Sequence, residues 1–182
     1  MTDSNKDIVH GDLKPENVLI FKGTAADYSA KVADFGWSCF ESIPGGKVFP
    51  PKSKPWFAPE WHHRGVSIEY AKRMDIFSLG MLCLWVILQH IVQQLPGVAH
   101  DEQIDPWLGL LQRANSTIDL LAEWKDRKAL NDLATHALKH LDGVMAQDKS
   151  SLLVFFRRSL QDPYLERESN ILRLVDDLGG HG

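Results

Sequence analysis

The sequence predicts a mainly α-helical fold with one small β-hairpin. Two observations predict it: apolar residues recur at helical spacing in several segments from residue 74 onward, and paired strand-like runs occur only before residue 34. The 182 residues are 44% hydrophobic and 24% charged, as in an ordinary globular domain. A chain of this length buries roughly 70% of its unfolded surface. We find no internal repeat and no boundary that indicates a second domain.

Two short apolar runs, residues 18–21 and 30–33, predict the hairpin. The segment between them, KGTAADYS, contains the Gly and Asp that favour a turn. Residues 37–59 follow, rich in Pro, Gly, Ser and Lys and without a helical period. This composition predicts a long irregular loop, and such loops inside a domain usually carry function.

Five later segments predict helices because their apolar residues recur at helical spacing. They cover residues 74–94, 105–114, 118–141, 150–160 and 169–178. Pro96 and Gly97 follow the first segment, and Asp162 and Pro163 follow the fourth, where they stop a helix.

Part of the first predicted helix raises the question of a membrane span. Residues 76–88 read IFSLGMLCLWVIL, thirteen residues without a charge. Crossing a bilayer takes about 20 residues, so we interpret the run as a helix buried on all sides within the domain. We therefore expect no membrane partner.

Charge and cysteine content exclude other classes. Twenty Lys and Arg stand against 24 Asp and Glu, and the pI is near 6.0, which does not indicate a nucleic-acid-binding surface. Cys39 and Cys83 make no disulfide framework, and the polar N-terminus lacks the apolar core of a signal peptide. We expect an intracellular protein, cytoplasmic or nuclear.

Two polar motifs carry the candidate chemistry. HGDLKPEN at residues 10–17 contains a carboxylate (Asp12), an ammonium (Lys14) and a carboxamide (Asn17), and DFG at residues 34–36 adds Asp34. A base, a cation and two oxygen ligands for a hard metal are the parts that phosphoryl transfer needs. Taken singly, each has a simpler interpretation as a turn residue or a solvated surface group.

Four motifs together resemble the C-terminal lobe of a eukaryotic protein kinase: HGDLKPEN, DFG, APE at residues 58–60 and DIFSLG from Asp75. The resemblance runs from His10 to about Arg173. It implies a partial protein kinase domain over residues 1–178, followed by a tail at residues 179–182. Its parts would be a catalytic loop at 10–17, the DFG motif at 34–36, an activation segment at 34–60 and a helical subdomain at 74–178.

The resemblance implies a role for each polar residue of the two motifs. Asp12 would be the catalytic base, and Lys14 would face the transferring phosphate. Asn17 and Asp34 would hold Mg²⁺, with ATP as the phosphoryl donor. The residues implied as structural support are His10, Phe35, Gly36, Glu60, Asp75 and Arg167.

Three of the implied contacts reach beyond these motifs. Ser53, seven residues before Glu60, is where Ser/Thr-directed kinases carry a hydroxyl that touches the catalytic Asp, although its setting, PPKSKPW, is unusual. Glu60 would pair with Arg167, the alternative being two exposed charges worth little. Asp75 would bind the backbone of the catalytic loop; as an acid near a helix N-terminus it also has a simple dipole interpretation.

The sequence departs from the kinase pattern at two places. Gly11 stands where most relatives have an Arg that receives an activation-segment phosphate, so we expect activity that does not depend on that phosphate. No GxGxxG loop and no VAIK lysine precede Asp12. We therefore expect a truncated C-terminal lobe, inactive alone, with an exposed apolar face that a partner covers.

The leading hypothesis is ATP- and Mg²⁺-dependent phosphoryl transfer to a protein hydroxyl, of Ser/Thr type. The alternative is a non-catalytic, kinase-derived binding module or scaffold. A small-molecule phosphotransferase is opposed by the APE motif and the distinct activation segment. His136 and His140 are four apart on a predicted helix, but no Glu follows His136 as in HExxH, so we do not expect a zinc site.

Overall fold

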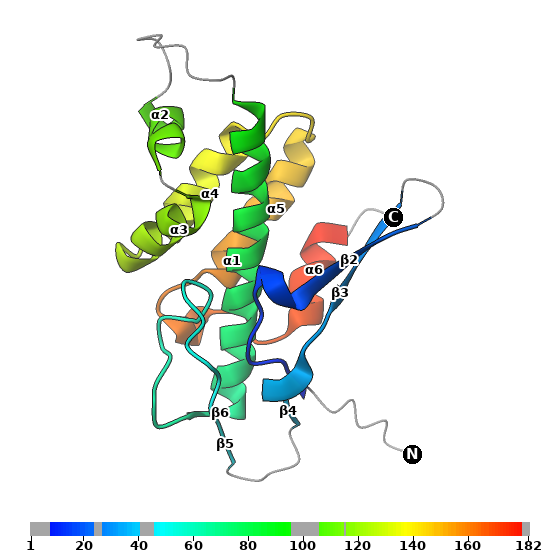
Figure 1. The fold of residues 1–182 in the computed structure, drawn as a ribbon, viewed down its shortest axis with the longest axis vertical. Helices are drawn as coiled ribbons and strands as arrows, with labels where there is room; N and C mark the ends of the chain where they lie inside the picture. Colours follow the sequence, from blue (N-terminus) through cyan, green and yellow to red (C-terminus); the bar gives the residue numbers. More distant parts are fainter. Residues whose placement is uncertain (1–7, 24–26, 41–45, 96–105, 115, 180–182) are drawn as a thin grey trace.

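A computed structural model describes residues 8–23, 27–40, 46–95, 106–114 and 116–179. Within these residues the fold is mainly helical, with three two-stranded antiparallel sheets. The predicted helix stop at Pro96 and Gly97, residue 105 and the tail from residue 180 lie outside the described part. The helices surround one long central helix, and the hairpin projects from its side (Figure 1).

The central helix, α1 (Ile68–Gln94), begins earlier than the predicted residue 74 and ends at the predicted residue. Its N-cap is Ser67, whose hydroxyl accepts the Tyr70 N–H at 3.4 Å. The first turns of α1 contain polar residues, so the apolar spacing did not reveal this start. The helix is also not buried on all sides, since Val86 is 54% exposed.

By length and composition α1 could cross a membrane, and 44% of its most apolar stretch is buried inside the protein. The core helix of a globular domain meets the same criteria. Helices α3, α4 and α5 and strand β1 all pack against α1.

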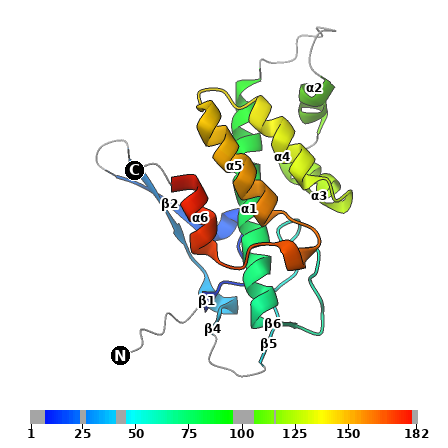
Figure 2. The same cartoon turned by 180° about the vertical axis from the view of Figure 1, so that it is seen from behind.

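The remaining helices are α2 (Pro106–Arg113), α3 (Thr117–Asp126), α4 (Leu130–Lys139), α5 (Ala146–Ser159) and α6 (Ile171–Gly179). The prediction of one helix over residues 118–141 is wrong, because α3 and α4 are separate. Lys128 between them has a φ of 56°, which a right-handed helix cannot contain. Helices α4 and α5 pack together, and α6 packs on α5 (Figure 2).

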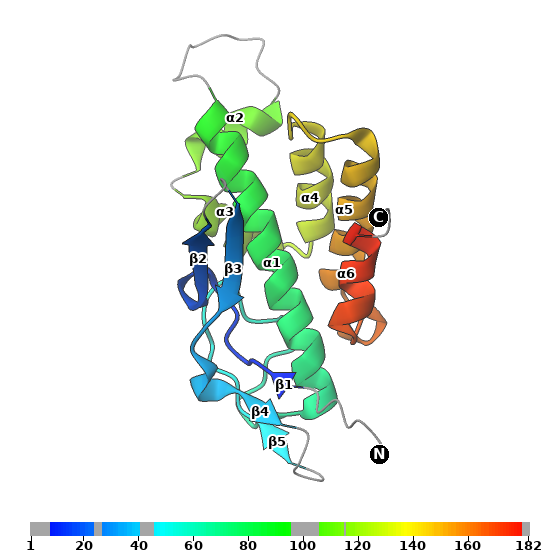
Figure 3. The same cartoon turned by 90° about the vertical axis from the view of Figure 1, so that its right-hand side faces the viewer.

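The predicted hairpin is confirmed. Strand β2 (Val18–Lys22) pairs antiparallel with β3 (Tyr28–Val32), in a register that places Val18 opposite Val32. The hairpin stands on one side of α1, with α4 and α5 on the other (Figure 3).

Four strands of two residues each were not predicted. Strand β1 (Ile8–Val9) pairs with β4 (Cys39–Phe40), and β5 (Lys47–Val48) pairs with β6 (Val66–Ser67). The predicted irregular loop at 37–59 therefore contains β4 and β5. Strands this short carry no alternation that a sequence pattern could reveal.

The main core lies between α1 and helices α3, α4 and α5. Its largest fully buried side chains include Phe77, Met81, Leu84, Leu121, Leu133, Phe155 and Phe156. Burying one such side chain contributes about 1.5–3 kcal/mol. This packing makes α1 a rigid support for the segments that contact its N-terminal half.

Candidate active site

Asp75, in α1, holds the backbone of the loop at residues 10–17. Its carboxylate accepts the His10 N–H at 2.6 Å and the Gly11 N–H at 2.9 Å. Burial raises the pKa of Asp75 to about 6, and the two backbone hydrogen bonds oppose that rise. The loop is thereby attached to the central helix of the fold.

His10 joins this loop to the segment that carries Asp34. Its Nε2 lies 2.9 Å from the Ala33 carbonyl oxygen, and its Nδ1 accepts the Asp12 N–H at 3.2 Å. Nε2 therefore carries the ring proton in this arrangement. The ring also packs edge-on against Phe35, with the centroids 5.1 Å apart. His10 thus fixes Asp12 and the residue before Asp34 in one unit.

Asp12 lies at the centre of the polar cluster and is 7% exposed. Its Oδ1 accepts the Ser53 hydroxyl at 2.6 Å, and its Oδ2 accepts the Lys14 ammonium at 2.6 Å. The hydrogen bond to Asp12 raises the pKa of Lys14. Each carboxylate oxygen has two lone pairs, so Oδ1 has capacity for a second hydroxyl.

Asn17 contacts Asp12, and Asp34 follows Ala33, whose carbonyl oxygen contacts His10. The buried Asn17 amide donates from Nδ2 to the Asp12 carbonyl oxygen at 2.9 Å, which leaves Oδ1 as the oxygen able to bind a cation. The main-chain oxygen of Asn17 accepts the Ala33 N–H at 2.9 Å. Asp34 is exposed, with a φ of 59°, and its Oδ1 accepts the Gly36 N–H at 3.2 Å.

The Asn17 amide and the Asp34 carboxylate are suited to Mg²⁺ rather than to a metal ion whose ligands all come from protein side chains. No cluster of three or more His, Cys, Asp or Glu that could hold a metal occurs in the part of the chain that the structure describes. Mg²⁺ needs only one or two protein oxygens when phosphates and water complete its shell. An amide oxygen and an exposed carboxylate supply that number.

The APE segment is attached to the C-terminal part of the fold. Glu60 Oε1 lies 2.5 Å from Arg167 Nη1, and the two side chains are 9% and 0% exposed. Arg167 also donates to the main-chain oxygens of Gln161 at 3.0 Å and Arg73 at 3.2 Å. Burial lowers the pKa of Arg167, and Glu60 opposes that shift. The C-terminal end of the loop at 37–59 is therefore held against the C-terminal part of the fold.

Two residues at this site carried no recognised signal in the sequence. Lys125 and Ser78 both donate to main-chain oxygens between Ser53 and Glu60. Ser78 lies within DIFSLG, so the motif could have drawn attention to it. Lys125 is about 70 residues from its partners, and no local pattern reports such a contact. His136 and His140, by contrast, stack on Trp107.

A groove lined by apolar and polar side chains lies beside the site. It has a volume of about 920 Å³ and runs between the hairpin side of the loop, α1 and α6. Its apolar lining residues are Ile8, Leu13, Val32, Phe35, Ile76, Ile171 and Leu172. Several of these side chains are exposed, as are Leu19, Ile20 and Phe21 of β2. Exposed apolar side chains gathered in this way are typical of an interaction site.

Known proteins similar to this chain are protein kinases. The family model of the protein kinase domain matches residues 4–165. A probable serine/threonine-protein kinase of Dictyostelium discoideum, dyrk2, is 36% identical over 102 residues, which are 56% of this chain and 10% of that protein. Calcium-dependent protein kinase 19 of Arabidopsis thaliana is 28% identical over 158 residues, 78% of this chain and 27% of that protein.

Mitogen-activated protein kinase 15 of Caenorhabditis elegans is 25% identical over 162 residues, 84% of this chain and 33% of that protein. The chain thus spans a third or less of the length of these three relatives. No solved structure gives a significant match.

Proposed function

Because the chain belongs to the protein kinase domain family, we propose that it supplies the catalytic-loop half of a Ser/Thr-type protein kinase site. Kinases of this family act on proteins and generally use ATP and Mg²⁺. The hydrogen bond from Ser53 to Asp12 carries the proposal, because it holds the loop at 37–59 against the carboxylate at 2.6 Å. The proposal places the protein inside the cell, where ATP is available.

In the proposed reaction Asp12 accepts the proton of a substrate Ser or Thr hydroxyl as that oxygen attacks the γ-phosphorus of ATP. The bond from the γ-phosphorus to the bridging β-phosphate oxygen breaks, and ADP leaves. The buried position of Asp12 and its backbone bond to His10 orient the carboxylate. Lys14, next to Asp12, would stabilise negative charge on the transferring phosphoryl group. Asn17 and Asp34 would hold Mg²⁺, which when bound neutralises phosphate charge.

We further propose that residues 1–178 form part of a kinase domain, with residues 34–60 as its activation segment and residues 74–178 as its helical subdomain. The adenine and the α- and β-phosphates would then need a second half-site, supplied by protein outside these 182 residues. The groove supports this, since its exposed apolar side chains are suited to being covered by protein. The chain alone would bind ATP weakly and transfer no phosphoryl group.

The same groove favours a second candidate function, a non-catalytic binding module or scaffold. In this case the protein that covers Ile8, Val32 and Ile171 would be a binding partner that supplies no nucleotide site. The polar cluster around Asp12 would then have a structural role only. The two candidates differ in whether Asp12 is needed for phosphoryl transfer once a nucleotide-binding half is present.

A fusion protein tests this difference. The nucleotide-binding half of a related protein kinase is joined ahead of Ile8, and transfer of labelled phosphate from ATP to a general protein substrate is measured. We expect transfer that falls about 10²–10⁴-fold on Asp12→Asn. The matched control, Asp27→Asn, removes an exposed carboxylate on the hairpin turn and should change little.

The outcomes separate the candidates. A folded, nucleotide-binding fusion that transfers no phosphate, or one whose transfer survives Asp12→Asn, would reject the proposed role of Asp12 and favour the binding module. Calorimetry on the 182-residue chain tests the half-site claim separately. Micromolar affinity for MgATP would reject it.

A further inference from the structure

Lys125, at the end of α3, reaches the loop between Ser53 and Glu60. Its ammonium donates to the main-chain oxygens of Pro55 at 2.8 Å and Phe57 at 2.5 Å. We propose that Lys125 is a positioning residue that fixes the stretch 53–57 and thereby holds Ser53 against Asp12. That the carboxylate beside Ser53 is catalytic rests on the proposed function, whereas the anchoring itself does not.

The surroundings of Lys125 show that its position is built rather than incidental. The residue is 9% exposed, and its ammonium lies 3.4 Å from the ring centroid of Phe57 and 5.7 Å from that of Phe77. Lysine is almost never this buried unless its charge has partners. Here the partners are two carbonyl oxygens and two aromatic faces, which attract a cation.

Charged neighbours act on this ammonium in both directions. Burial lowers the pKa of Lys125 to about 8. Asp126 and Glu60 oppose the fall, and Lys52 and Lys54 add to it. At neutral pH Lys125 is thus mostly charged, so its bonds to the carbonyl oxygens are charge-assisted and stronger than neutral ones.

The main-chain oxygens of residues 55, 56 and 57 all accept hydrogen bonds from buried side chains. Lys125 donates to the oxygens of Pro55 and Phe57, and the Ser78 hydroxyl of α1 donates to the main-chain oxygen of Trp56 at 2.9 Å. A buried carbonyl needs such a partner, and this stretch lies outside any helix or sheet that would provide one. Two helices therefore define the path of the loop.

A short series of hydrogen bonds connects Lys125 to Asp12. Lys125 binds the Phe57 oxygen, the Phe57 N–H donates to the Ser53 oxygen at 2.9 Å, and Ser53 donates to Asp12 at 2.6 Å. If the first bond is lost, the Phe57 turn loses its attachment to α3. The Ser53 hydroxyl is then free to leave Asp12.

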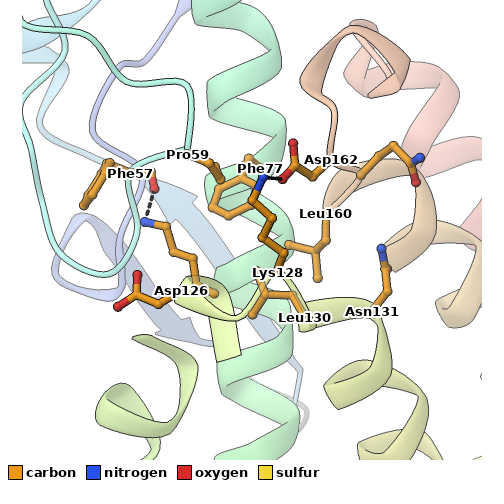
Figure 4. Close-up of a pocket in the computed structure, with 11 residues that line it drawn as sticks. Phe57, Pro59, Phe77, Asp126, Lys128, Leu130, Asn131, Leu160 and Asp162 are labelled. Carbon is orange, nitrogen blue, oxygen red and sulfur yellow. Dashed lines mark hydrogen bonds and ion pairs between the residues drawn. The ribbon is translucent and has the colours of Figure 1, made fainter. Parts of the chain in front are cut away.

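A pocket of about 310 Å³ opens beside Lys125. A second lysine at this pocket, Lys128, is a suitable control. Phe57, Phe77, Leu130 and Leu160 line the pocket (Figure 4). At its edge Lys128 pairs with Asp162 at 3.3 Å, and its side chain is 76% exposed. Lys128 has the same charge as Lys125 and lies three residues further along, but no hydrogen bond joins it to residues 55–57 within the described contacts.

Hydrogen exchange on the full 182-residue chain tests the proposal. Lys125→Met keeps the length of the side chain and removes its donors, and Lys128→Met is the matched control. We expect amide exchange across residues 53–61 to become about tenfold faster in Lys125→Met and to stay within about twofold in Lys128→Met. Exchange in α1 should not change, and Lys125→Arg, which keeps a cationic donor, should restore most of the protection.

Equal exchange across residues 53–61 in wild type and a folded Lys125→Met would overturn the proposal. So would a Lys125→Arg variant as unprotected as Lys125→Met, since loss of packing alone would then explain the effect. Because Lys125→Met could unfold, pulse acetylation of the wild-type chain is a second measurement. Lys125 should react about tenfold more slowly than Lys128, and equal rates would overturn the anchoring.

These results are independent of catalysis. An inactive fusion protein whose stretch 53–61 is protected by Lys125 would reject the proposed kinase function and leave the anchor in place. An active fusion whose protection is unchanged by Lys125→Met would do the reverse.

Discussion

Glu60 and Arg167 lie 107 residues apart in the sequence, and their side chains meet at 2.5 Å in a site almost closed to water. The contact joins the end of the loop at 37–59 to the segment that follows α5. Among the described residues, the cationic side chains of Arg167 and Lys125 both face the ring of Phe77. Because Phe77 belongs to α1, this helix contacts both of the cationic side chains that bind the segment at residues 55–60.

Breaking the Glu60–Arg167 pair should destabilise the fold strongly. In Glu60→Gln the buried guanidinium loses its counter-charge, and we expect the free energy of unfolding to fall by ~3–5 kcal/mol. Urea unfolding measures it. The exposed pair of Glu123 and Arg127 is the comparison, and Glu123→Gln should cost under about 1 kcal/mol. Similar losses at both sites would show that burial does not strengthen the Glu60 contact.

Asp75 should give the fold a characteristic pH dependence. Its pKa is raised from 3.8 to about 6 in the folded chain. The folded state therefore binds more protons than the unfolded state between these values, and the stabilisation from Asp75 is full below pH 3.8 and lost as pH rises through 6. Wild type should lose up to ~3 kcal/mol relative to Asp75→Asn across this window.

The measurement for Asp75 is the free energy of unfolding at several pH values between 4 and 7. Asp132→Asn, which changes an exposed carboxylate on α4, is the control and should keep the wild-type slope. A slope in Asp75→Asn equal to that of wild type would show that another group titrates.

Gly80 should be intolerant of even a methyl group. A Cβ built there would lie 2.5 Å from the Ser159 hydroxyl oxygen and 2.9 Å from a methyl carbon of Leu160. Gly80→Ala should therefore push α1 and α5 apart and cost about 1–3 kcal/mol, although alanine favours helix. Thermal unfolding measures it, with Val86→Ala on the exposed side of α1 as the control. A stabilised Gly80→Ala would mean that the contact between the helices adapts.

Local sequence patterns predicted the elements that have a clear period. The hairpin, the end of α1 and the helical second half all follow from apolar spacing and turn residues. The break at Lys128 was missed because its positive φ leaves no gap in the apolar pattern of residues 118–141. Strands β1, β4, β5 and β6 were missed because pairing between distant two-residue segments depends on the tertiary fold.

The sequence predicted those residues of the candidate site that belong to the recognised motifs or to the family pattern. The sequence identified Asp12, Ser53 and Asp75 through a family resemblance, and the structure brings Asp12 and Ser53 into contact and Asp75 against the loop backbone. The two side chains that donate to the main-chain oxygens of residues 55–57, Lys125 and Ser78, were not predicted from the sequence. A lysine that binds backbone oxygens leaves no signature in residue type or spacing, since carbonyl groups are the same at every position.

The central claim is that Asp12, Asn17 and Asp34 form one half of a phosphoryl-transfer site. NMR line broadening tests it most directly, using the 182-residue chain, Mn²⁺ in place of Mg²⁺, and a non-hydrolysable ATP analogue. We predict weak binding, with broadening of amide signals at residues 10–17 and 34–36 that is lost in Asp34→Asn and kept in Asp27→Asn. Broadening that spares these residues, or that persists unchanged in Asp34→Asn, would contradict the claim.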